Sequence, residues 1–132
     1  MNAAAGRAPG RLLFYELWPS SSSTFEASQA EELIRQGRAR LRRKYEVQIV
    51  PLRELVARHF AGQGIDLLSI DTEGRDTEVL EGLDWLITRP RLVVAEINAA
   101  GRADDSAAHF LLSQGYAHAA RIACNAFFVR PD

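Results

Sequence analysis

The stretch IDLLSIDTEG, residues 65–74, decides the fold. Its first part, Ile65 to Ile70, is nearly all apolar, which is typical of a strand that is covered on both faces, and acidic residues and a glycine follow directly. A second buried-strand pattern lies over Arg91–Ile97, and helical spacing of apolar residues separates the two over about Asp76–Leu83. The sequence therefore predicts a strand-helix-strand unit with polar residues at the end of its first strand.

The same alternation extends to either side of this unit. A half-buried strand is expected over 45–49, a helix begins after Pro51, another runs through Leu112, and two strands follow at about 117–123 and 126–130. The order from residue 45 onward is strand, helix, strand, helix, strand, helix, strand, strand. We therefore predict an α/β fold with a mostly parallel sheet, an antiparallel C-terminal edge strand and helices on both faces.

Composition indicates one soluble globular domain. The 132 residues are 47% hydrophobic and 25% charged, and 16 basic against 17 acidic side chains give a net charge of -1, which argues against nucleic-acid binding. No apolar run approaches the roughly 20 residues of a membrane span, and the N-terminus lacks the order of a secretory signal, so we expect a cytoplasmic protein with no membrane partner. Residues 1–10 are expected to be disordered and 11–132 to form the domain.

Basic residues concentrate in the run RARLRRK, residues 38–44. The run follows a helix predicted from Ser28, and we expect it to end that helix, where cations complement the helix dipole and stay solvated. No aromatic residues interleave with the charges, so the run does not favour nucleic-acid binding. A further strand is predicted before it, over Arg11–Trp18.

Polar residues that could carry chemistry follow the two most apolar strands. Right-handed crossovers bring the ends of these strands, at Asp71 and Glu96, to one rim of the sheet, where open α/β sheets bind ligands. Paired carboxylates at such a rim can accept a proton from a hydroxyl, hold a cation by charge, or bind a divalent metal. A metal site built from Asp71, Glu96 and Asn98 is the less favoured of these alternatives.

The segment 65–74, followed by EVLEG at 78–82 and RPRLVVAE at 89–96, resembles the C-terminal half of the FkbM-type methyltransferases. Those enzymes use S-adenosylmethionine on a Rossmann-like sheet, and their fourth strand typically runs into Asp-x-Glu-Gly while a Glu closes the fifth. Asp71, Glu73 and Gly74 occupy the first set of places here, and Glu96 the last. The resemblance therefore implies a partial Rossmann-like methyltransferase sheet.

The resemblance also implies an activity: transfer of a methyl group from S-adenosylmethionine to a hydroxyl of a sugar, another glycan or a secondary metabolite. Asp71, Glu73 and Glu96 are then the expected catalytic residues, and Asp71 and Gly74 the expected cofactor contacts. For Glu73 the alternative of capping the next helix stays open. Polar contacts to the acceptor are expected from two amide side chains, those of Asn98 and Asn125.

The sequence also departs from the family pattern. Family members carry a glycine-rich turn after their first strand and then an acidic residue that binds the ribose, whereas Gly62-Gln63-Gly64 precedes a strand and cannot serve as that turn. Ser69 stands where many relatives have Lys. We therefore expect a truncated methyltransferase.

Two other classes of function stay open. One is a non-catalytic methyltransferase remnant that associates, through an open sheet edge, with a second copy or with a separate N-terminal half. The other is a small α/β ligand-binding module unrelated to methyl transfer. The single cysteine, Cys124, lies in apolar sequence and is interpreted as a packed thiol, and the three histidines are isolated and carry no predicted role.

Overall fold

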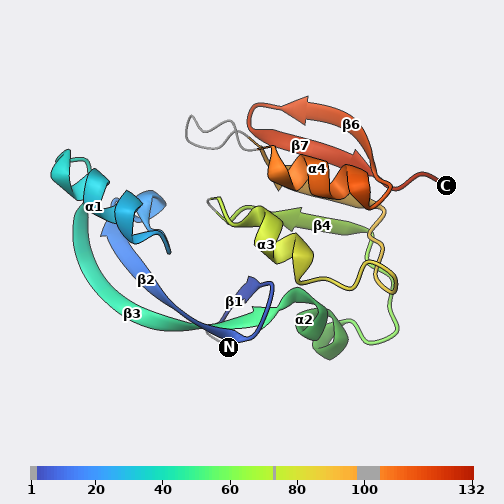
Figure 1. The fold of residues 1–132 in the computed structure, drawn as a ribbon, viewed down its shortest axis with the longest axis horizontal. Helices are drawn as coiled ribbons and strands as arrows, with labels where there is room; N and C mark the ends of the chain where they lie inside the picture. Colours follow the sequence, from blue (N-terminus) through green and yellow to red (C-terminus); the bar gives the residue numbers. More distant parts are fainter. Residues whose placement is uncertain (1–2, 73, 98–104) are drawn as a thin grey trace. The chain divides into compact units, whose positions relative to one another are not determined.

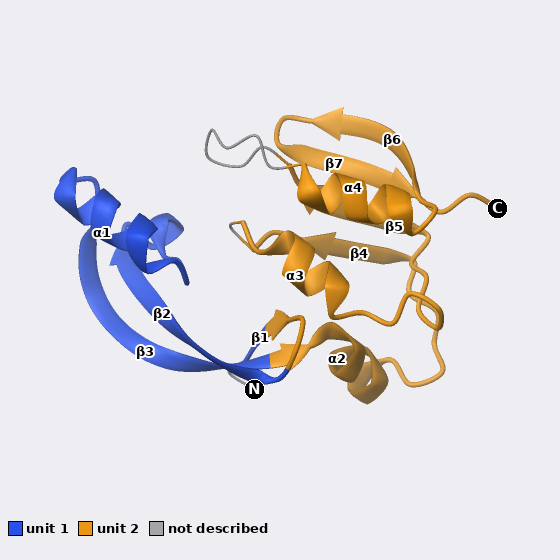
Figure 2. Ribbon diagram, viewed as in Figure 1, with its two compact units in different colours: residues 1–4, 9–49 blue, residues 5–8, 50–132 orange. Residues whose placement is uncertain are grey.

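The computed structural model describes residues 3–72, 74–97 and 105–132. It divides into two compact units, unit 1 with residues 1–4 and 9–49 and unit 2 with residues 5–8 and 50–132 (Figures 1 and 2). The strands are β1 Ala3–Gly6, β2 Gly10–Trp18, β3 Arg40–Pro51, β4 Leu67–Ile70, β5 Leu92–Glu96, β6 Ala117–Ile122 and β7 Asn125–Val129. The helices are α1 Ala27–Arg35, α2 Leu52–His59, α3 Asp76–Glu81 and α4 Ser106–Ser113, with a 3-10 turn at Ser20–Ser22.

Unit 1 is built on a long antiparallel ribbon of β2 and β3. The pairing runs from Gly10 opposite Ile49 to Trp18 opposite Arg40, with one irregularity after Glu16. Phe14 is the centre of its aromatic packing, because its ring lies 4.8 Å from that of Phe25 and 5.6 Å from that of Tyr45. The Phe14–Tyr45 pair crosses from β2 to β3, and such cross-strand aromatic pairs stabilise a two-stranded ribbon.

The basic run lies in strand β3 from Arg40 onward, and the prediction that it ends a helix is wrong. Helix α1 stops at Arg35, and Gly37 takes a left-handed φ of +67°, which turns the chain out of the helix before the run begins. Within the strand, Arg43 pairs with Glu16 of β2 and its guanidinium lies over the ring of Tyr45. Cross-strand partners, which local spacing does not reveal, therefore place these cations in a strand.

The first described residues, Ala3–Gly6, form strand β1, within the segment that was expected to be disordered. The sheet order is β1-β3-β2, so β1 obtains its backbone hydrogen-bond partners from a strand more than thirty residues away. The alanines themselves have low strand propensity, and only this pairing makes them a strand.

The sheet of unit 2 has the order β4-β5-β7-β6 and is mixed. Strands β4 and β5 are parallel, with Leu67 opposite Leu92, whereas β7 runs antiparallel to both β5 and β6. The predicted succession of strands and helices from residue 45 onward is confirmed, but the mostly parallel sheet is not. The reason is that β7 returns between β5 and β6, so that β4 and β5 form the one parallel pair of this four-stranded sheet.

The core of unit 2 lies on one face of this sheet. Figure 1 shows α3 and α4 on that face, and the two helices are in contact. Helix α2 packs partly against the same core through Leu52 and Val56. Buried side chains from both the sheet and the helices form this core. The strands contribute Ile70, Val93, Ala95, Ala126 and Phe128, and the helices contribute Val79, Leu80, Ala107 and Leu111. The sequence predicted helices on both faces of the sheet. The described helices of unit 2 instead cover one face, and that prediction is wrong.

The opposite face, here called the open face, carries the alternate residues of the same strands. Leu67 is 56% exposed on β4, Ser69 is exposed, and Val94 and Phe127 are half-buried. The prediction that the apolar run at 65–70 is covered on both faces is therefore wrong. Strand β4 also forms one edge of the sheet order. Within the ranges that the structure describes, no helix is long and apolar enough to span a bilayer.

Candidate functional site

The carboxyl ends of β4 and β5 meet at one end of the sheet. Ile70 pairs with Ala95 in the parallel register, so Asp71 and Glu96 come next on their two strands, and Glu96 pairs with Asn125 at the start of β7. These three side chains form a row across the open face, because Ile70 and Ala95 point to the opposite, buried side. The structure thus brings together three of the residues that the sequence singled out.

Glu96 holds a buried oxygen in this row. Its Oε2 atom is shielded from solvent and accepts no hydrogen bond from the described residues, while Asp71 is exposed. A buried carboxylate oxygen without a donor costs free energy, and it attracts a cation or a hydrogen-bond donor. Glu96 is therefore the residue of the row with a buried acceptor oxygen to which no described residue donates.

Cys124 completes this group of residues, which we call the carboxyl rim: Asp71, Glu96, Cys124 and Asn125. Cys124 lies in the two-residue turn between β6 and β7, and its backbone carbonyl oxygen accepts a 2.7 Å hydrogen bond from the amide of Ile97. The pKa of Cys124 is raised, first by a hydrogen bond to Glu96, then by burial, and further by the negative charges of Glu96 and Asp71. The thiol therefore stays protonated at neutral pH.

Asp76 is a functional candidate that the sequence analysis did not single out. The residue is only 4% exposed and begins helix α3, yet each of its oxygens is used. Oδ1 accepts hydrogen bonds from the amide of Thr72 at 2.9 Å and from its hydroxyl at 2.5 Å, and Oδ2 accepts one from the amide of Glu96 at 2.9 Å. The Thr72-to-Asp76 spacing was visible in the sequence, but the bond to β5 was not.

The other predicted site residues are Gly74, Glu73 and Asn98, and only the first of them is described by the structure. Gly74 has a left-handed φ of +99°, which favours glycine at this strand-to-helix turn, and its predicted contact with a cofactor stays a prediction. Glu73 and Asn98 lie outside the described residues. Among those that are described, no group of three or more His, Cys, Asp or Glu side chains is arranged to hold a metal ion.

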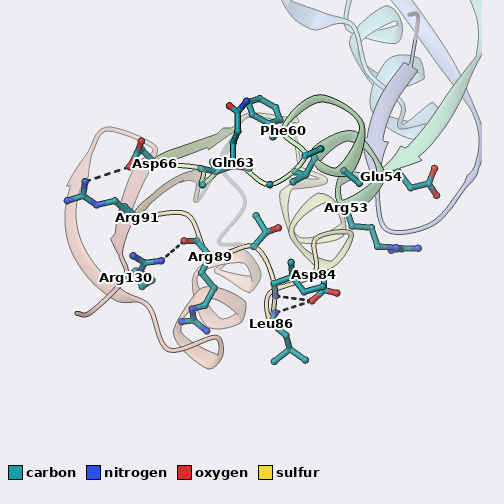
Figure 3. Close-up of a pocket in the computed structure, with 18 residues that line it drawn as sticks. Arg53, Glu54, Phe60, Gln63, Asp66, Asp84, Leu86, Arg89, Arg91 and Arg130 are labelled. Atoms are coloured by element: carbon teal, nitrogen blue, oxygen red, sulfur yellow. Dashed lines mark hydrogen bonds and ion pairs between the residues drawn. The ribbon is translucent and has the colours of Figure 1, made fainter.

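A large hollow lies at the other end of the sheet, where β4 and β5 begin (Figure 3). It has a volume of about 1180 Å³ and is lined by α2, by residues 60–66 and by the segment around 84–91. Its charged side chains are largely engaged, since Arg91 pairs with Asp66 at 3.6 Å and Arg130 donates to the carbonyl oxygen of Arg89 at 2.8 Å. No pattern in the sequence predicts this hollow, and the length of the strands separates the hollow from the carboxyl rim.

The fold and the carboxyl rim define a mixed α/β domain whose acidic residues follow the ends of a parallel strand pair, the position at which open α/β sheets bind ligands. The family model described as the methyltransferase FkbM domain matches residues 1–117, and the chain belongs to this family. The family predicted from residues 65–96 is thereby confirmed. No curated protein and no solved structure matches the chain.

Proposed function

We propose that this chain takes part in methyl transfer from S-adenosylmethionine to a hydroxyl group, and that Asp71 and Glu96 face the reacting groups. The observation that carries the proposal is the buried Oε2 of Glu96, which lacks a donor beside the exposed Asp71 in a domain of the FkbM methyltransferase family. The sugar or secondary-metabolite acceptor is part of the same proposal.

The carboxyl rim fits a methyl donor of this kind on chemical grounds. S-adenosylmethionine, when bound, supplies an electrophilic methyl group on a positively charged sulfur. Glu96 offers a negative charge and an unused acceptor oxygen, and nothing lies within 4 Å of the Cβ position of Gly74. A cationic ligand satisfies the buried oxygen that the described residues leave without a donor.

Asp71 is the residue that we assign to proton transfer. An alkyl hydroxyl becomes a useful nucleophile only as its proton leaves, and a positioned general base contributes roughly 10²–10⁴-fold to the rate. The exposure of Asp71 lets an acceptor hydroxyl reach its carboxylate, whereas Glu96 is half-buried. We assign Asn125, whose strand register pairs it with Glu96, to a second hydroxyl of the acceptor.

Calorimetric titration with S-adenosylhomocysteine tests the cofactor part of this proposal. We expect micromolar binding by the wild-type chain and, in a parallel titration with S-adenosylmethionine, whose sulfur carries the positive charge, a loss of about tenfold in affinity for Glu96→Gln, since tenfold corresponds to about 1.4 kcal/mol, the scale of one charge-assisted contact. Glu78→Gln is the matched control, because Glu78 lies on α3 with its carboxylate paired to Arg75 at 2.7 Å and outside the carboxyl rim. Absence of binding by the wild-type chain contradicts the proposal.

Proton transfer by Asp71 has a separate test. Wild-type and Asp71→Asn chains are incubated with S-adenosylmethionine and a panel of sugars, and methylated products are detected by mass spectrometry. We expect the variant to keep its affinity for S-adenosylhomocysteine within a few-fold and to lose roughly 10²-fold or more in rate. Equal rates for the two chains would remove Asp71 from the reaction.

A second candidate function is favoured by the edge position of β4. Strand β4 is an edge of its sheet and carries the exposed Leu67 on the open face, and such an edge pairs readily with another strand. We propose association with a second copy of this chain, β4 to β4, as the alternative role. Ser69→Pro prevents this pairing because proline removes a backbone donor. A dimer in light scattering that Ser69→Pro abolishes, together with no binding of S-adenosylhomocysteine, supports association over catalysis.

A further inference from the structure

We infer that Asp76 is a positioning residue: it fixes the end of β4 against the end of β5, and so sets the separation between Asp71 and Glu96. The catalytic meaning of this inference rests on the proposed function, but the geometry that carries it does not. Asp76 itself is 4% exposed and is assigned no contact with substrate or cofactor.

The two oxygens of Asp76 serve two different strands. Oδ1 takes both donors of Thr72, the residue after Asp71, and Oδ2 takes the amide of Glu96. A carboxylate that only started helix α3 would need the local contact with Thr72 alone. The bond to Glu96 spans twenty residues of sequence and connects the helix to the neighbouring strand.

The chemistry of these bonds requires a carboxylate of this length. All three bonds to Asp76 come from donors, so an acceptor is needed on both sides, and Asn offers an acceptor on only one. Asp76→Asn therefore turns an N–H toward either Thr72 or Glu96 and opens one of the two connections. The expected result is a shift of one acidic residue relative to the other, with the helix retained.

Cys124 supplies a readout of this shift that does not depend on catalysis. The charged groups that act on its thiol are Glu96, from β5, and Asp71, from the end of β4, and the hydrogen bond to Glu96 is the largest cause of its raised pKa. Displacement of Glu96 therefore lowers the pKa of Cys124 toward that of an ordinary thiol. Because the chain has one cysteine, the rate of alkylation by iodoacetamide against pH reports this thiol alone.

The experiment compares the wild-type chain with Asp76→Asn by this alkylation profile and by titration with S-adenosylhomocysteine. We expect the alkylation midpoint of Asp76→Asn to fall by about half a pH unit or more and the affinity to fall by about tenfold, with native circular dichroism. An unchanged midpoint in a folded Asp76→Asn chain overturns the inference, because a purely structural role changes stability and leaves the profile in place.

A milder pair of variants covers the case in which Asp76→Asn does not fold. Thr72→Val removes the hydroxyl bond to Asp76 and leaves the backbone bond, whereas Thr72→Ser keeps both. We expect a lowered midpoint for Thr72→Val and a wild-type midpoint for Thr72→Ser; identical profiles for the two contradict the inference. If the wild-type chain binds no S-adenosylhomocysteine while the midpoints move as expected, the proposed function fails and the positioning role stands.

Discussion

The carboxylate of Glu96 raises the pKa of the Cys124 thiol, and the two residues come from different strand connections of the same sheet. Glu96 ends β5, while Cys124 lies in the turn that leads into β7. A cysteine in the apolar part of the sequence thus becomes a neighbour of two carboxylates in the fold. The pH dependence of the reactivity of this thiol therefore reports on the carboxyl rim.

The first prediction concerns this reporter. Because the pKa of Cys124 is raised in the folded chain, the thiol favours the fold fully below the ordinary cysteine pKa, and this contribution is lost as the pH rises through the folded value. Alkylation of the native chain should therefore reach its half-maximal rate at a higher pH than alkylation of the chain in denaturant. Glu96→Gln should lower the native midpoint, and a midpoint that coincides with that of the denatured chain excludes the contact.

Tyr116 provides a second prediction, at alkaline pH. Its hydroxyl donates to the carbonyl oxygen of Pro90 at 2.7 Å, and burial raises its pKa, although the positive charges of Arg89 and Arg130 partly oppose the shift. The folded chain should lose stability as the pH rises above about 10, where the unfolded tyrosine ionises.

The variant Tyr116→Phe isolates this effect. It should cost about 1 kcal/mol at neutral pH, since the carbonyl oxygen of Pro90 loses its donor, and it should remove part of the alkaline loss. Urea unfolding at neutral pH and above pH 10 measures both. Tyr45→Phe, in the exposed part of β3, should keep the alkaline loss. The same pH dependence in both variants would contradict the assignment to Tyr116.

Gly82 gives a third prediction, which depends on close backbone approach. A Cβ atom at this position overlaps the carbonyl oxygen of Gly6 and comes within 3.1 Å of the amide nitrogen of Leu52. Gly82→Ala should therefore destabilise unit 2 by about 1–3 kcal/mol in urea unfolding. Gly64→Ala is the control, because nothing lies within 4 Å of its Cβ position, and it should be neutral or slightly stabilising. Equal stability of the two variants would show that Gly6 does not pack there.

A fourth prediction distinguishes the two faces of the sheet in unit 2. Phe128 is fully buried against the helices, while its neighbour Phe127 lies half-buried on the open face. Phe128→Ala should cost about 3–5 kcal/mol, and Phe127→Ala about 1 kcal/mol, because less apolar area is involved. The two free energies of unfolding come from urea titrations followed by circular dichroism. Similar losses would mean that the open face is covered as well as the helical one.

Local periodicity was enough to predict most of the elements. Apolar spacing within 45–130 gave the correct succession of strands and helices, because that spacing depends on residues a few positions apart. The position of β7 between β5 and β6 depends on pairing between distant segments, which local spacing does not contain. The basic run at 38–44 shows the same limit, since strand partners such as Glu16 override its helical interpretation.

The carboxyl rim was predicted only in part. Asp71 and Glu96 were found because each polar residue directly follows an apolar strand, and parallel strands end at the same side. Asp76 was missed because its second hydrogen bond reaches a strand twenty residues away. Cys124 was interpreted from its apolar neighbours in sequence, whereas its neighbours in space are carboxylates. The surroundings of Asp76 and Cys124 are therefore set by contacts between different strands and not by their neighbours in sequence.

The mixed sheet also sets an order of assembly. The hairpin of β6 and β7 closes through a two-residue turn and can form early, whereas β4 joins β5 only after more than twenty intervening residues have been organised. Glu96 reaches Cys124 only when β5 has paired with β7, which closes a still longer loop. The slowest kinetic phase of refolding should therefore coincide with the recovery of native thiol reactivity.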